Sequence, residues 1–401
     1  MPRQIKSEYA KAGVDYTQIE PFKQTMIELG KKTLTFPNKR GVYINEDVVH
    51  SHGAVFEYRG KSPCIWCQTQ EGLGNKNWIA EWMYLKTGQS YYENIGIDTA
   101  LMAVNDLIAQ GAMPVVFTDH IDVGDSSWYS EKRSLDLAKG FYKICKEVGM
   151  ALPAGESAAL KYLVNPKSPV KMAPSLSGSV AGIICPRKRL ITGKKLQAGD
   201  RIIGVTSSGL HANGVSLVIK KAMELPKKFL TKLPNGNTLG KEALIPTRSY
   251  TKLIEALLEA EIDIHALLPG TGDGVGKIAF DKRMFTYRIY SWTKVPPLFL
   301  LMKELGLSLK NCLKTFNWGI GYYIFVSERD VQKTLKIGRD NKYNLLEIGL
   351  VEEGQRKVIF EPENIELSTP RQHPVKITGD HTQNRFFGAF LVNKGGDNFI
   401  D

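Results

Sequence analysis

The stretch IGIDTALMAVNDLIAQGAMP, residues 95–114, has the clearest structural pattern in the chain. Its apolar residues recur at helical spacing and share one face: Ala100, Leu101, Val104, Leu107 and Ile108. Asp98 stands where an N-cap belongs, and Gly111 is a natural C-terminal stop. The pattern predicts an amphipathic helix. The next segment, PVVFTDH (114–120), has the pattern of a strand.

The polar residues of this helix allow two interpretations. Asn105 follows Asp98 by seven residues and projects from almost the same side, and Asp106 comes next. In one interpretation these residues form the solvated face of a capped helix. In the other, their oxygens are ligands for a hard cation such as Mg2+, which takes carboxylates and keeps substrate phosphates as further ligands. The helix alone leaves both open.

A glycine-bearing loop, TQEGLGNK (69–76), precedes the helix. It has neither the G-x-x-x-x-G-K-[ST] spacing nor the G-x-G-x-x-G spacing of common nucleotide-binding loops. Gly72 and Gly74 could offer backbone N–H groups to a phosphate, with Lys76 as counter-charge and Glu71 as a metal ligand. The alternative is an ordinary glycine turn that ends in a solvated lysine.

Three later glycine-rich segments also allow either a ligand contact or a tight turn. SSGLHANG (207–214) follows the predicted strand RIIGVT and precedes the predicted helix GVSLVIKKAMEL, an arrangement typical of anion-binding helix entries. In it, His211 is either a substrate donor or a structural histidine. PGTGDGVGK (269–277) and FNWGIG (316–321) are flanked by hydrophobic runs and could bring backbone close to a ligand.

The chain of 401 residues is long enough for about two domains. We expect an N-terminal arm (1–60) with a helix near 20–31, and an N-terminal domain over 61–185. A basic linker (186–200) separates it from a C-terminal domain (201–360), and an extension (361–401) follows. Strands alternate with helices in both domains, which predicts an α/β or α+β class with helices covering one sheet face.

The net charge of +12 raises the question of nucleic-acid binding. The basic residues are mostly dispersed, and no zinc-finger, RNA-recognition or helix-turn-helix signature accompanies them. A basic surface that attracts small phosphorylated substrates explains the charge equally well, so nucleic acid is not the expected partner. No secretory signal and no run of 18 apolar residues is present, so we expect no membrane association and a cytoplasmic location.

Five scattered cysteines in an intracellular chain argue against a disulfide framework. Cys64 and Cys67 form a C-x-x-C, which could be redox-active or half of a zinc site. No second C-x-x-C or H-x3-H follows, and CIWCQTQ has the pattern of a buried strand. We therefore expect buried thiols at both positions.

The order and wording of these segments resemble the phosphoribosylformylglycinamidine cyclo-ligase family, also called the aminoimidazole ribonucleotide synthetase family. The resemblance covers most of residues 9–360. Its motifs follow in the family's order: YAKAGVD, HGAVFE, GIDTALMAVNDLIAQGAMP, AGESA, LSGSVAGII, GDRIIGVTSSGLHANGVSLV, ALIPTRSY and TFNWGIGYYI. Together these motifs are very specific.

The resemblance implies an α+β fold with two domains, similar to aminoimidazole ribonucleotide synthetase. Helices would cover one sheet face, and the N-terminal sheets of two subunits would pair in a homodimer with ATP in a cleft nearby. It also implies ATP-dependent ring closure of formylglycinamidine ribonucleotide, a small phosphorylated substrate, in purine biosynthesis. ATP would activate the formamide oxygen, the amidine nitrogen would attack the activated carbon, and phosphate would leave. Such chemistry needs positioning and charge neutralisation more than a nucleophile.

Carried over position by position, the resemblance implies the following roles. Asp98, Asp106 and Lys76 would be catalytic, and Glu71 would join the two aspartates around Mg2+. The ATP-binding set would comprise Glu71, Gly72, Gly74, Lys76, Asn105, Asp119 and Glu156, and the substrate-binding set Ser207, Ser208, Gly209, His211 and Asn213.

The chain departs from the family's pattern at several of these segments. Glu71 and Asn75 replace an aspartate and a threonine of the family's loop, and Pro269 and Asp273 replace a histidine and a glycine. Proline has no side-chain donor or acceptor. The alternatives are therefore a paralogue of the same superfamily with another substrate, or a non-catalytic protein that binds nucleotide.

Overall fold

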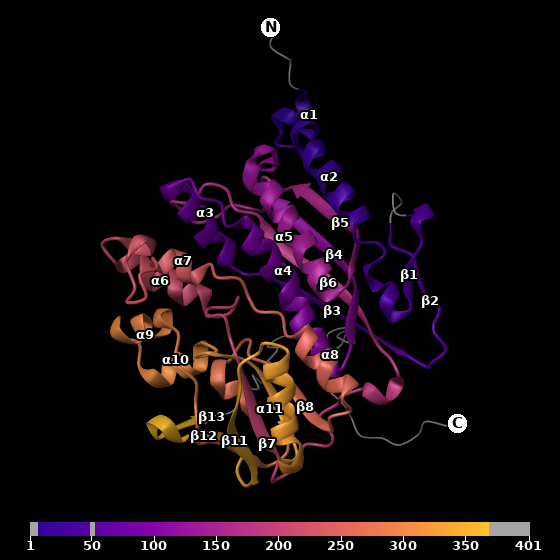
Figure 1. The fold of residues 1–401 in the computed structure, drawn as a ribbon. Helices are drawn as coiled ribbons and strands as arrows, with labels where there is room; N and C mark the ends of the chain where they lie inside the picture. Colours follow the sequence, from indigo (N-terminus) through magenta and orange to yellow (C-terminus); the bar gives the residue numbers. More distant parts are fainter. Residues whose placement is uncertain (1–6, 49–52, 369–401) are drawn as a thin grey trace, which may run out of the picture. The chain divides into compact units, whose positions relative to one another are not determined.

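The computed structural model describes residues 7–48 and 53–368. It contains a four-stranded sheet in the N-terminal half, a seven-stranded sheet in the C-terminal half and a small hairpin near the start (Figure 1). Strands and helices occur in both halves, which confirms the α+β class. His52 and the segment after residue 368 lie outside the described residues.

The N-terminal sheet has the strand order β3-β6-β4-β5. Its strands are β3 (Ile65–Gly72), β6 (Ser175–Ile184), β4 (Met113–Val123) and β5 (Ala151–Ala159). β6 is antiparallel to both of its neighbours, whereas β4 and β5 are parallel. Because parallel strands need a crossover, α5 (Lys132–Val148) connects them.

Helices cover one face of this sheet (Figure 1). α4 (Tyr92–Leu107) contacts β3 and β6, α2 (Tyr16–Lys31) contacts β5, and α3 (Lys76–Thr87) packs beside α4. On the other face, the hairpin of β1 (Val42–Ile44) and β2 (Phe56–Tyr58) covers one end, where Phe56 meets Trp66 edge-on. A short helix, α1 (Glu8–Lys11), precedes α2. The predicted one-sided layering is confirmed for this sheet.

The start of the helix predicted within residues 95–114, which is α4, differs from the prediction. α4 begins at Tyr92, so Asp98 lies inside the helix and the expected N-cap role is wrong. The reason is tertiary packing: Tyr92 is fully buried, and its hydroxyl donates to Glu81 Oε1 at 2.6 Å, which holds the extra turn in place. Gly111 does end the helical path, with φ of 77° and its N–H on Ile108 O.

The C-terminal sheet has the strand order β13-β12-β9-β11-β7-β10-β8 and is antiparallel except for the pair β12–β9. Its strands are β7 (Arg201–Thr206), β8 (Ile264–Pro269), β9 (Phe285–Ile289), β10 (Ile320–Val326), β11 (Leu345–Glu353), β12 (Lys357–Phe360) and β13 (Ile365–Ser368). Its helices are α6 (Val215–Glu224), α7 (Leu239–Ala243), α8 (Thr251–Glu259), α9 (Pro297–Glu304), α10 (Leu309–Thr315) and α11 (Val331–Asp340). No helix among the described residues is both long and apolar enough to cross a bilayer.

The two halves share buried contacts. Ile108 and Met113 pack in one hydrophobic cluster with residues of α8, β8 and β10. Arg40, just before β1, donates to Pro114 O at 2.6 Å and pairs with Glu255 of α8 at 3.0 Å. The two halves therefore share an interface and are not independent modules.

The expectations for the cysteines are wrong, because one disulfide is present and Cys67 is not fully buried. Cys64 and Cys185 form a disulfide, whereas Cys67 is a free, half-buried thiol. The pairing of β3 with β6 places Ile65 opposite Ile184, so the cysteines next to these residues meet. The two cysteines are 121 residues apart, which is why the sequence pattern did not reveal the pair.

Helices α4 and α5 approach each other most closely at two glycines. A Cβ on Gly140 would lie 2.2 Å from Glu93 O, and a Cβ on Gly96 would lie 2.5 Å from Leu137 O. Both obstacles are backbone atoms of the facing helix, which cannot rotate aside as a side chain can. The crossing therefore requires glycine at both positions.

We predict that Gly140→Ala lowers the free energy of unfolding by about 1–3 kcal/mol, because the methyl group overpacks the crossing. At an unstrained helix position the same change raises stability by up to about 1 kcal/mol, so the sign is diagnostic. Urea unfolding measures it, with the exposed neighbour Lys139→Ala as control, expected within about 0.5 kcal/mol of the parent. A stabilised Gly140→Ala would contradict the close crossing.

Candidate functional site

The loop 69–76 places its lysine inside the protein rather than in solvent. β3 ends at Gly72, Gly74 turns the chain with φ of 73°, and α3 begins at Lys76. The Lys76 side chain is fully buried. Its ammonium donates to Leu210 O at 3.0 Å and Ile245 O at 2.8 Å, and lies 2.9 Å from Asp98 Oδ2. The ammonium thus has two hydrogen bonds to carbonyl oxygens and one ion pair with Asp98.

Asp98 and Asn105, seven residues apart on α4, bind the backbone of the segment 245–250. Asp98 Oδ1 accepts from Thr247 N at 2.6 Å. The Asn105 amide donates to Arg248 O at 3.0 Å and accepts from Tyr250 N at 3.3 Å. We call Lys76, Asp98 and Asn105 the interdomain clamp, because they join α3 and α4 to the C-terminal half.

Burial and charge oppose each other in the clamp. Desolvation lowers the pKa of Lys76, and the adjacent Asp98 carboxylate counteracts that shift. The ion pair and two carbonyl acceptors together replace the hydration that the ammonium loses on burial. Its role in this structure is to hold the two halves together.

A second charged group lies at the C-terminal end of α4, beside Asn105. Glu71, Asp106, Asp273 and Lys277 interact electrostatically, and we call them the carboxylate–lysine cluster. Burial raises the pKa of Asp106, and burial together with the Asp106 charge raises the pKa of Glu71. Burial lowers the pKa of Lys277 against the effect of the carboxylates. Asp106 Oδ1 is buried and has no hydrogen-bond partner among the described residues.

The turn after β7 is fixed to the segment before β10. Gly209 has φ of 129°, and its carbonyl accepts from the Asn317 amide at 2.9 Å. Ser207 Oγ donates to Asn317 Oδ1 at 3.2 Å, and Ser208 Oγ donates to Pro246 O at 2.7 Å. Asn317 belongs to the FNWGIG segment, so the two glycine-rich segments form one structural unit.

Two further residues of this turn carry buried polar atoms with no partner in the described chain. They are His211 Nε2 and Asn213 Oδ1. Burial and the nearby Lys76 lower the pKa of His211 to about 3, so its imidazole is neutral at pH 7. Asn213 lies near Gly272, a neighbour of the cluster's Asp273. Unsatisfied polar atoms at one turn indicate a place where a polar ligand can bind.

A groove of 1100 Å³ borders the glycine loop. Gly72, Gly74 and Asn75 line one wall, and residues 163–168, 173–177 and the α6 face line the others. Asn75 Nδ2 donates to Ser216 Oγ at 2.8 Å and so ties the loop to α6. The groove is large enough for a nucleotide.

Two family models match the chain in succession. The AIR synthase related protein N-terminal domain matches residues 66–184, and the AIR synthase related protein C-terminal domain matches residues 197–361. A phosphoribosylformylglycinamidine cyclo-ligase of Pyrococcus furiosus is 32% identical over 348 residues, covering 86% of this chain and 95% of the relative. The chain belongs to this family. Another such relative, from Carboxydothermus hydrogenoformans, is 33% identical and covers 75% of this chain and 84% of its own length.

Solved structures show the same fold at lower identity. Escherichia coli HypE, a hydrogenase maturation protein, superposes with a TM-score of 0.57 at 16% identity, covering 87% of this chain and 98% of that one. Thiamine-monophosphate kinase from Stenotrophomonas maltophilia gives a TM-score of 0.55 at 15% identity, with 88% and 98% covered. The family fold is therefore present in this chain.

The residues expected to surround Mg2+ do not all meet. Asp98 and Asp106 are eight residues apart, roughly 12 Å along the helix axis, and Asp98 is engaged in the clamp. In residues 7–48 and 53–368 no group of three His, Cys, Asp or Glu side chains is placed to hold a metal. Mg2+ is usually held by one or two carboxylates plus substrate phosphates. Glu71 and Asp106, with an unpartnered oxygen, fit that requirement.

The family departures fall at defined places. Glu71 is in the carboxylate–lysine cluster, and Asn75 makes the contact to Ser216. Pro269 is the buried last residue of β8, opposite Tyr322. Asp273 is exposed with φ of 69° and adds negative charge near Lys277.

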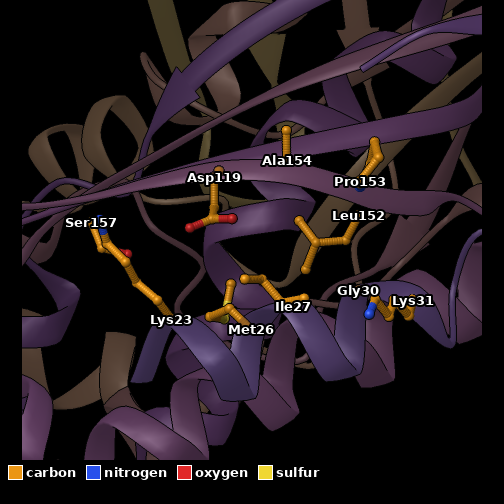
Figure 2. A pocket seen from close by; sticks show the side chains of 11 residues that line it. Lys23, Met26, Ile27, Gly30, Lys31, Asp119, Leu152, Pro153, Ala154 and Ser157 are labelled. Carbon is orange, nitrogen blue, oxygen red and sulfur yellow. The ribbon is translucent and has the colours of Figure 1, made fainter. Parts of the chain in front are cut away.

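Asp119 and Glu156 lie away from the cluster. Asp119 and Glu71 both pair with Gly178, on opposite sides, so they are two strand spacings, about 10 Å, apart. Figure 2 shows the Asp119 carboxylate directed from β4 toward α2, where it lines a cavity of 150 Å³. Both of its oxygens lack a partner in the described chain, and Glu156 is exposed on the neighbouring strand.

Sequence reasoning missed Lys277 and Asn317 as site residues. Lys277 joins the cluster from a 3-10 turn, Gly274–Ala279, that follows β8. Asn317 connects the turn after β7 to FNWGIG. Both stand in glycine-rich segments that the sequence marked as ligand approaches, but only the fold shows which side chains face the site.

We predict that Lys76→Met lowers the free energy of unfolding by about 3–5 kcal/mol, because it leaves Asp98 buried without its counter-charge. The control is Lys143→Met, since Lys143 pairs with Glu93 at a similar 2.8 Å but both side chains are exposed. That variant is expected to lose less than about 1 kcal/mol. Equal losses in urea unfolding would contradict the role of the clamp.

We predict a pH effect at Asp119, whose pKa burial raises to about 7. Above the ordinary carboxyl value the unfolded chain releases this proton while the native chain keeps it, so rising pH favours unfolding. Relative to Asp119→Asn, the parent should lose about 2–3 kcal/mol of unfolding free energy between pH 5 and pH 8. Identical pH dependence of the two proteins in urea titrations would contradict the raised pKa.

Proposed function

We propose that this protein catalyses the ATP-dependent ring closure of formylglycinamidine ribonucleotide to aminoimidazole ribonucleotide, a step of purine biosynthesis. The observation that carries the proposal is 32% identity to a named cyclo-ligase over 86% of this chain. That span includes the loop 69–76, helix α4 and the three glycine-rich segments of the C-terminal half. Their arrangement suits a reaction in which ATP activates the formamide oxygen and phosphate leaves.

The groove beside the glycine loop is the proposed nucleotide site. Its wall contains Gly72 and Gly74, where no Cβ shields the backbone from a phosphate. Lys167 and Lys220 also line it and supply positive charge. HypE, which shares the fold, has been solved in complex with ATP, which supports nucleotide binding by this architecture.

Glu71 and Asp106 are the residues that would hold Mg2+. The bound ion would neutralise negative charge on the phosphates. The two carboxylates would fix the position of the ion. Because both are partly buried, their charge interactions are stronger than they would be in water. On the substrate side, His211 and Asn213 offer a neutral imidazole nitrogen and an amide oxygen that have no other partner in the described chain.

The clamp has a positioning role in this proposal. Asp98 and Lys76 would keep the glycine loop and α4 in place, while Asp106 at the end of the same helix would face the phosphates. This division explains how one helix can carry both a fully buried ion pair and a carboxylate with an unpartnered oxygen. Such positioning matters because a displacement of a catalytic group by about 1 Å reduces the rate strongly.

We further propose that the protein is a cytoplasmic homodimer. The sheet face opposite the helices exposes Trp66, Gln68 and Gln70 on β3 and His120 on β4. An exposed tryptophan among polar side chains is suited to an interface with a second copy. Sedimentation of the parent and of Trp66→Glu measures it, and a monomeric parent at micromolar concentration would contradict the dimer.

We predict that Asp106→Asn reduces turnover at least about 100-fold, because the site loses a charge that orients the metal and phosphates. Formation of aminoimidazole ribonucleotide and ADP is followed with ATP, Mg2+ and formylglycinamidine ribonucleotide. Asp340→Asn, at an exposed pair on α11, is the control and should retain full activity.

The thermal unfolding midpoint of Asp106→Asn should remain near that of the parent, because Asp106 Oδ1 has no partner to lose in the described chain. Unchanged turnover by Asp106→Asn would remove this residue from the mechanism. No product from the parent itself, with ATP hydrolysed or not, would contradict the cyclo-ligase assignment.

A further inference from the structure

Lys277 is the one positively charged residue of the carboxylate–lysine cluster. It stands in the turn Gly274–Ala279, whose start is tightly seated: a Cβ on Gly274 would lie 2.4 Å from Leu313 O. The backbone of the turn is therefore held against α10, and the lysine side chain projects from a fixed base. It is more than half buried and faces carboxylates from β3, α4 and its own loop.

The Lys277 ammonium has charge partners nearby but no direct ion pair. Asp106, Asp273 and Glu71 all act on it electrostatically. Among the described residues, however, no carboxylate oxygen lies within 4.0 Å of its Nζ, and its hydrogen bond is to Thr271 Oγ1. An ammonium carries three donors, so two remain without a protein acceptor there.

Lys76 shows what a purely structural buried lysine looks like in this chain. It has two hydrogen bonds to carbonyl oxygens and an ion pair with Asp98, all within 3.0 Å. Lys277 has one acceptor, and the facing Asp106 Oδ1 also lacks a partner. A bound group could satisfy both residues if it accepts hydrogen bonds from the Lys277 ammonium and carries a cation that contacts the Asp106 carboxylate. A phosphoryl group with its bound divalent cation has that chemistry.

We propose that Lys277 binds the terminal phosphoryl group of the nucleotide, on the side opposite Glu71 and Asp106. This inference rests on the proposed function for the identity of the nucleotide. Carboxylates alone repel a triphosphate. Lys76 is held in the clamp, and Lys167 and Lys220 line the groove, so Lys277 is the lysine that lies among the cluster's carboxylates and would touch the reacting phosphate. It is thus a further catalytic residue of the site.

The competing explanation is that Lys277 only neutralises the acidic side chains around it. The two explanations differ in what rescues the loss of the lysine. If Lys277 neutralises charge, removal of one neighbouring negative charge restores nucleotide binding. If it donates to the phosphoryl group, only another donor restores it, and an arginine can do so.

The test is equilibrium binding of ATP and of AMP to the full-length protein, by calorimetry without Mg2+ and without the second substrate. Lys277→Met is expected to weaken ATP binding about 10- to 100-fold and to leave AMP binding unchanged, since AMP lacks the terminal phosphates. Lys277→Arg should recover most of the ATP affinity. Lys357→Met, at a comparably placed lysine paired with Glu366 on the outer strands, is the control and should match the parent.

The double variant Lys277→Met/Asp273→Asn separates the explanations, because Asp273 is exposed and outside the proposed metal-holding pair. Continued weak ATP binding supports the direct contact, whereas restored binding overturns it. Equal ATP affinity of Lys277→Met and the parent also overturns it. The two proposals can fail separately. If the parent makes no aminoimidazole ribonucleotide but Lys277→Met loses the preference for ATP over AMP, the contact is supported and only the cyclo-ligase proposal is contradicted.

Discussion

The buried ammonium of Lys76 is the constraint on which the site depends. Removing a charge from water is unfavourable by several kcal/mol unless every donor finds an acceptor and a counter-charge lies close by. Asp98 and two carbonyl groups of the C-terminal half provide that environment. The loop, α4 and the segment 245–250 must therefore adopt one relative arrangement before the lysine can be buried.

That arrangement determines where the chemistry can occur. α4 carries the clamp on Asp98 and Asn105, and Asp106, the residue after Asn105, interacts with Glu71 and Lys277. The clamp thus holds α4 at Asp98 and again at Asn105, directly beside the carboxylate of Asp106. The groove is lined by Gly72 and by the loop that follows Glu71, so it borders the end of the strand that carries one member of the cluster.

Much of this architecture could be predicted from the sequence. The periodicity of residues 95–111, the strands around it and the order of the motifs indicate the fold class and the family, because local pattern and packing agree there. The start of α4 was missed since buried tertiary contacts of Tyr92 extend the helix beyond its pattern. The Cys64–Cys185 bond and the place of Lys277 depend on strand pairing and on contacts across the halves, which no local pattern encodes.

The clamp also affects how the two halves can be combined. Its acceptors in the C-terminal half are backbone carbonyl groups, those of Leu210, Ile245 and Arg248. A main-chain acceptor reads the path of the chain and not the identity of the side chain. Chimeras that join this N-terminal half to the C-terminal half of a distant relative should therefore keep this contact wherever the backbone trace is preserved. The apolar contacts of Ile108 and Met113 and the Arg40–Glu255 pair, in contrast, also require matching side chains.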